Sequence, residues 1–102
     1  MVTIRVGNDT RPLEESDPNW LTQAIQGRRN NGLAVCVVVT INEPGISVVL
    51  QTTDCQSSVG GGRTPRDRER QILSLWEKLH LHEPEFAPGN LVAFVKQLPQ
   101  LL

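Results

Sequence analysis

Few residues of this chain could do chemistry, and the best group of them is a glycine-rich stretch. It carries serines, three consecutive glycines and two arginines just before an expected helix. Exposed backbone N–H groups and a helix N-terminus attract anions, so this stretch is a candidate phosphate site. The residues that would form it are Ser57, Ser58, Gly60, Gly61, Gly62, Arg63 and Arg66.

The stretch lacks both glycine patterns that hold nucleotide phosphates, G-x-x-x-x-G-K-[ST] and G-x-G-x-x-G. The competing interpretation, which the pattern favours, is a linker between a strand and a helix. The four arginines between 63 and 70 present a similar choice. They form either a docking patch for a phosphate or acidic partner, or a solvated helix start in which Asp67 and Glu69 offset their charge.

A second group lies between the last two expected helices, where His80, His82, Glu83 and Glu85 fall within six residues. Imidazoles and carboxylates bind zinc, but structural zinc draws its ligands from two separated pairs, and the sequence offers no second pair. A polar connection between helices is the simpler interpretation. We therefore predict no metal and no cofactor.

The two cysteines are predicted to be free thiols. If a hairpin pairs Ile41 with Ile46, Cys36 and Cys55 lie four pairs apart, or roughly 13 Å at ~3.3 Å per residue. A disulfide spans much less. Cys36 then lies in an apolar strand, and Asp54 disfavours a thiolate at Cys55. We expect no catalytic nucleophile, and two free thiols indicate a cytoplasmic location.

Composition limits the partners that the chain can have. Its 102 residues fit one domain, residues 1–102, with 10 basic and 11 acidic side chains and a net charge of −1. This balance gives no overall attraction to nucleic acid. The longest apolar run, from 33 to 39, is far shorter than the ~20 residues of a membrane-spanning helix, and the first residues do not resemble a signal peptide.

The strongest structural signal is the sequence LAVCVVVTINEPGISVVL, at residues 33–50. It predicts a hairpin of strands 33–41 and 46–53, with its turn at Pro44-Gly45. The first strand is apolar on both sides, so we expect it at the centre of a sheet that is covered on both faces. The second strand has a wetter face, which is typical of a sheet edge.

The remaining elements follow from periodicity and helix-end signals. Residues 2–6 alternate as a half-buried strand, and residues 7–16 are expected to be a loop. Three helices are expected. The first begins at Pro18, capped by Asp17, and is stopped by Asn30-Asn31-Gly32; the second begins at Thr64-Pro65; the third runs from Pro88 or Asn90 to Leu98, where Pro99 ends it.

These elements predict an α+β fold in the order β-α-β-β-α-α. Strands 2–6 and 33–41 are joined through a helix, so we expect them to be parallel. The prediction is a small three-stranded mixed sheet, with strand 33–41 in the centre and three helices packed against it.

Two hypotheses of function follow. The first is a non-catalytic protein-interaction or regulatory module that binds a protein partner or a second copy. It would use the edge of strand 46–53, the terminal helix pair or the tail 98–102, whose last leucines either cover the core or contact the partner. The alternative is a small phosphate- or nucleotide-binding domain, or an enzyme, that uses residues 57–66. We expect no membrane or nucleic-acid partner.

Overall fold

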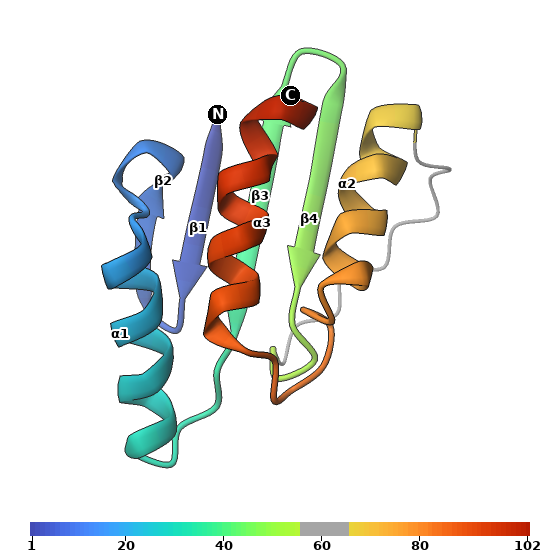
Figure 1. Ribbon diagram of the computed structural model, residues 1–102. Helices are drawn as coiled ribbons and strands as arrows, with labels where there is room; N and C mark the ends of the chain where they lie inside the picture. The colour runs from blue at the N-terminus through green and yellow to red at the C-terminus, as the bar shows by residue number, and fades with distance from the viewer. Residues whose placement is uncertain (56–65) are drawn as a thin grey trace.

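The structure, a computed structural model, describes residues 1–55 and 66–102. It confirms the α+β class, but the sheet of the described residues has four strands and is antiparallel throughout, where we expected three strands in a mixed sheet. The elements in chain order (Figure 1) are β1 (Val2–Val6), β2 (Asp9–Pro12), a 3-10 helix (Leu13–Glu15), α1 (Pro18–Asn30), β3 (Val37–Glu43), β4 (Ile46–Gln51), α2 (Asp67–Lys78) and α3 (Pro88–Leu101).

The strand that the sequence prediction missed is β2, which forms a hairpin with β1. Val6 pairs with Asp9, so Gly7 and Asn8 alone make the turn. Gly7 has φ +64°, a conformation that glycine adopts without steric cost and that two-residue hairpin turns require. The expectation of a loop over residues 7–16 was therefore wrong for Asp9–Pro12.

The extra strand also explains why β1 and β3 are antiparallel instead of parallel. The strand order is β2-β1-β3-β4, and Val2 pairs with Ile41 while Val6 pairs with Val37. Because β2 reverses the chain before α1 begins, the helical connection runs from β2 to β3. Those two strands point the same way, with β1 between them.

The β3–β4 hairpin is confirmed, with a different register. Glu43 pairs with Ile46 and Ile41 with Val48, so only Pro44 and Gly45 lie in the turn. Gly45 has φ +81°, which a type II turn requires after proline. A register change of two residues leaves each side chain on its expected face. Strand β3 begins at Val37, four residues later than expected.

In the described residues the helices cover only one face of the sheet, contrary to the expectation of cover on both. In Figure 1 α3 lies between α1 and α2, and both of these helices contact α3, so the three form a single layer. The buried apolar residues form one cluster between this layer and the sheet. On β3 the inward Val37 and Val39 are fully buried, whereas the outward Val38 and Thr40 are half-buried.

The predicted start of α1 is correct, and the predicted end of α3 is not. Asp17 caps α1 as predicted, since its carboxylate accepts the Trp20 N–H at 2.8 Å. Pro99 does not end α3, which continues to Leu101. A proline this close to the C-terminus of a helix removes one N–H from the last turns only. The fully buried Leu98 and the partly buried Leu101 hold those turns against the core.

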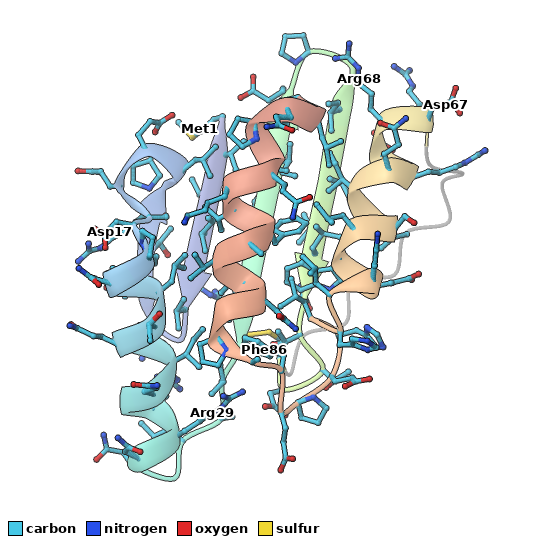
Figure 2. The ribbon with its side chains drawn as sticks, in the orientation of Figure 1. Met1, Asp17, Arg29, Asp67, Arg68 and Phe86 are labelled. Atoms are coloured by element: carbon cyan, nitrogen blue, oxygen red, sulfur yellow. A yellow bond between two sulfur atoms is a disulfide. The ribbon has the colours of Figure 1, made fainter. Side chains whose placement is uncertain are left out.

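Side-chain contacts hold the segment before α3, and α2 itself, against the rest of the helical layer. Phe86 is buried just before α3, and the Arg29 guanidinium donates to its carbonyl oxygen at 2.7 Å and lies 5.1 Å from its ring centroid (Figure 2). Trp76 of α2 meets Phe94 of α3 edge to face at 5.3 Å.

Within the described ranges, no helix combines the length and the apolar character needed to cross a membrane.

Candidate functional site

Most of the predicted phosphate site lies outside the described residues. That applies to Ser57, Ser58, Gly60, Gly61, Gly62 and Arg63, and also to the expected helix start at Thr64-Pro65. Arg66 is described: its side chain is exposed at the start of α2, and its backbone N–H donates to the Glu69 carboxylate at 3.3 Å. The phosphate site stays a prediction.

The other two described arginines of this stretch contact their own chain. The Arg70 guanidinium lies 3.9 Å from the Asp67 carboxylate, and Arg68 donates to the main-chain oxygen of Leu102 at 2.9 Å. Both arginines are exposed, as expected for a solvated helix start. Exposed ion pairs of this kind contribute little to stability.

The histidines at the end of α2 belong to a tight turn. His80 has φ +59°, and its Nδ1 lies 3.2 Å from the Glu83 carboxylate, while the His80 and His82 rings are 6.3 Å apart. Among residues 1–55 and 66–102, no three His, Cys, Asp or Glu side chains are grouped closely enough to hold a metal ion.

The prediction of two free thiols was wrong, because Cys36 and Cys55 form a disulfide, with their Cα atoms 4.7 Å apart. The prediction placed the cysteines four pairs apart, but in the observed register Val38 pairs with Gln51, which puts Cys36 opposite residue 53 and only two pairs from Cys55. The prediction also treated the second strand as straight to residue 53. Instead β4 ends at Gln51 and the chain turns at residues 53–54, where the Cys55 N–H donates to the Thr52 carbonyl at 3.2 Å. This turn brings Cys55 back beside β3, next to Cys36.

The two sulfur atoms lie in different electrostatic surroundings. The Cys36 sulfur accepts a hydrogen bond from the exposed Arg5 guanidinium at 3.7 Å. The Cys55 sulfur lies 3.6 Å from the Thr52 hydroxyl and 3.8 Å from the Val37 carbonyl oxygen. One sulfur therefore faces a cation and the other faces oxygen atoms.

The sheet face opposite the helices, which we call the open face, carries almost no charge. Strand alternation and register assign its side chains, which are Thr3, Arg5, Thr10, Pro12, Val38, Thr40, Asn42, Ser47, Val49 and Gln51. Arg5 is the only charged side chain among them, although 21% of the whole chain is charged. Depletion of charge, more than apolar character, distinguishes the centre of a protein interface from other surface.

The outer edge of β4 is confirmed as a sheet edge, and α2 closes part of it. Glu69 is only 3% exposed, and its Oε1 accepts the Ser47 N–H at 3.1 Å. Every second residue of β4 directs its backbone N–H and C=O groups away from β3. After Ser47, the residues that do so are Val49 and Gln51. Val49 is also 42% exposed on the open face. The available edge is therefore short.

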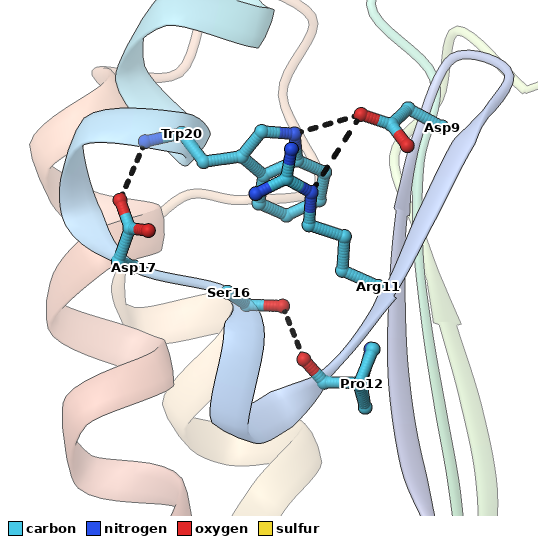
Figure 3. Close-up of polar contacts among 6 residues, drawn as sticks. All are labelled: Asp9, Arg11, Pro12, Ser16, Asp17 and Trp20. Carbon is cyan, nitrogen blue, oxygen red and sulfur yellow. Dashed lines mark hydrogen bonds and ion pairs between the residues drawn. The ribbon is translucent and has the colours of Figure 1, made fainter.

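One further cluster, Asp9, Arg11 and Trp20, connects the β1–β2 hairpin to α1 (Figure 3). The Trp20 indole donates to the Asp9 carboxylate at 2.8 Å, and Arg11 lies 3.8 Å from that carboxylate and 4.7 Å from the indole centroid. No sequence pattern pointed to it, because it depends on a hairpin that was not predicted. Its polar groups bind one another, which indicates a structural role.

No family model, curated protein or solved structure matches this chain. Its function is therefore inferred from its own geometry.

Proposed function

We propose that this protein is a non-catalytic interaction module that binds a second copy of itself through the open face. The observation that carries the proposal is a four-stranded sheet with its described helices on one side only. The other side presents threonine, valine and amide side chains around a single arginine. Two such faces can pack about 10 Å apart, as in other face-to-face sheets, with few charges to desolvate.

The size of the open face predicts how tightly two copies bind. Four strands at ~4.8 Å spacing, with four to seven residues each at ~3.3 Å, give about 350 Å² of flat area per copy. Stable interfaces bury about 800 Å² per partner. We therefore expect a weak, reversible dimer with two-fold symmetry, in which Thr3 of β1 and Thr40 of β3 lie near the centre and Val49 lies on the outer strand β4.

Sedimentation equilibrium over a range from about 10 μM to 1 mM tests this proposal, since weak association requires concentrations near the dissociation constant. We expect the average mass to rise toward that of a dimer. Val49→Lys places a charge on the open face and should keep the chain monomeric. Ser74→Lys adds the same charge on the exposed side of α2 and should not. A wild-type chain that stays monomeric throughout would refute self-association.

Of the residues predicted to form the phosphate site, only Arg66 lies in the described part of the chain. Thermal melting can distinguish a phosphate-binding domain from an interaction module. Pyrophosphate and nucleotides stabilise a protein that binds them in its folded state. For an interaction module we expect no shift in melting temperature. A shift that Arg66→Ala abolishes would support the alternative.

The predicted cytoplasmic location rested on two free thiols, and the Cys36–Cys55 disulfide removes that support, so this location stays a prediction. The compartment decides which role the disulfide has. Disulfides are stable in oxidising compartments, whereas those of cytoplasmic proteins are mostly transient, catalytic or redox-sensing. A cytoplasmic location therefore implies that Cys36 and Cys55 exchange between the oxidised and reduced forms.

A further inference from the structure

We infer that Cys36 and Cys55 are a redox-active pair that exchanges electrons with small disulfides, with Cys36 as the attacking cysteine. The inference does not depend on self-association. It rests on the different contacts of the two sulfur atoms, on their partial exposure and on the position of the pair at one end of the sheet.

Arg5 is the residue that distinguishes Cys36. Its guanidinium donates to the Cys36 sulfur at 3.7 Å from the neighbouring strand β1. In the reduced protein, a guanidinium in this position stabilises the thiolate, which is the form that attacks disulfides. No other charged side chain points out from the open face of the described strands, so no carboxylate there offsets this effect.

Cys55 is placed to stay protonated. Its sulfur faces the Thr52 hydroxyl at 3.6 Å and the Val37 carbonyl at 3.8 Å. The hydroxyl hydrogen of Thr52 is already donated to the Val35 carbonyl at 3.0 Å, and the same oxygen accepts the Val37 N–H at 3.1 Å. Both neighbouring oxygens can therefore accept the hydrogen of a thiol but cannot stabilise a thiolate. Cys55 is suited to act second.

The exchange takes two steps with a small disulfide, RSSR, such as oxidised glutathione. First, the Cys36 thiolate attacks one sulfur of RSSR, its S–S bond breaks, and one RS⁻ leaves and takes a proton from solvent. Next, Cys55 gives its proton to solvent and attacks the Cys36 sulfur, and the second RS⁻ leaves. The protein dithiol loses two electrons to form the disulfide, and RSSR gains them to form two thiols.

Alkylation of the reduced full-length chain tests the assignment of roles. After reduction and removal of the reductant, a limiting amount of iodoacetamide at pH 7 is followed by peptide mass mapping. We expect Cys36 to react at least about fivefold faster than Cys55, because the thiolate is the reactive form. Equal rates, or a faster reaction at Cys55, would overturn the assignment.

Two sets of variants test the mechanism. Arg5→Gln should slow alkylation of Cys36 severalfold, whereas Lys96→Gln removes an exposed positive charge from α3 and should not. In Cys55→Ser, oxidised glutathione should form a stable mixed disulfide with Cys36. In Cys36→Ser, the remaining Cys55 should react with oxidised glutathione much more slowly. Far-UV circular dichroism confirms that each variant is folded. If Arg5→Gln behaves like Lys96→Gln, Arg5 does not activate Cys36. If reduced glutathione never opens the disulfide of the folded protein, the bond is structural only.

Discussion

The Oε1 atom of Glu69 lies 3.1 Å from the backbone nitrogen of Ser47 and accepts its N–H, so an acid on α2 closes part of the edge of β4. Its other oxygen accepts the Arg66 N–H at the start of the same helix. One nearly buried carboxylate thus joins the helix start to the sheet edge. Unpaired edge groups invite pairing with other chains, and a covering side chain reduces that risk.

Glu69→Ala should lower the free energy of unfolding by about 1–2 kcal/mol, because it leaves two partly buried N–H groups without their acceptor. Glu69→Gln keeps one acceptor oxygen and should lose about half as much. Urea unfolding measures both. Glu77→Ala, an exposed change on the same helix, is the control. Equal midpoints for Glu69→Ala and Glu77→Ala would show that these contacts contribute nothing.

Reduction of the disulfide should also destabilise the fold. Cys36 and Cys55 are 19 residues apart in sequence. Closing a loop of that length in the unfolded chain corresponds to about 3 kcal/mol in the chain-entropy model. Urea unfolding with and without reductant measures the difference, and the Cys36→Ser, Cys55→Ser double variant should show no response to reductant. A wild-type midpoint that reductant leaves unchanged would contradict this prediction.

Two glycines should respond to alanine in opposite directions. Gly7 has φ +64°, a backbone conformation that strains any residue with a Cβ, so Gly7→Ala should destabilise the protein by about 1 kcal/mol or more. Gly27 lies in α1 with open space around it, so Gly27→Ala should stabilise by about 0.5–1 kcal/mol. Thermal melting of the two variants gives the signs directly, and shifts in the same direction would disprove this reading.

Trp20→Phe removes the indole donor to Asp9 and weakens the contact with Arg11. The expected loss is about 1–2 kcal/mol, from one hydrogen bond to a charged group and one cation–π contact at a partly exposed site. Chemical denaturation measures it against Gln26→Ala, an exposed change on the same helix. If the two variants unfold together, the cluster does not hold the β1–β2 hairpin to α1.

Local signals predicted local structure well. The Asp17-Pro18 start of α1 was correct because capping involves only neighbouring residues. The β3–β4 hairpin was found because its strands are rich in β-branched residues and Pro44-Gly45 marks the turn. The β1–β2 hairpin carries an equally local signal, since Gly7-Asn8 is a two-residue turn sequence. It was missed because Asp9–Pro12 is a polar strand that ends in proline, which seldom indicates a strand.

Most errors at longer range follow from that missed hairpin and from one turn. Without β2, the direction of β1 relative to β3 was reversed. The two-residue error in the β3–β4 register doubled the expected separation of Cys36 and Cys55, and the turn after Thr52 brings the two residues the rest of the way together. The number of helix layers was also wrong, because the apolar outer side of the predicted strand depended on Ala34 and Cys36, which precede β3. The roles of Arg5 and Glu69 depend on contacts between distant segments, which periodicity does not encode.

The pairing of β1 with β3 also determines the order in which the chain can fold. Val2 lies opposite Ile41, so forming this pairing closes a loop that contains β2 and all of α1, whereas β3 and β4 meet across two residues. Loop closure of that length is entropically costly and slows folding. The β3–β4 hairpin should therefore form early, and the β1–β2 hairpin should pack against β3 last. Substitutions that shorten buried side chains of β1 should then speed up unfolding and leave the refolding rate almost unchanged.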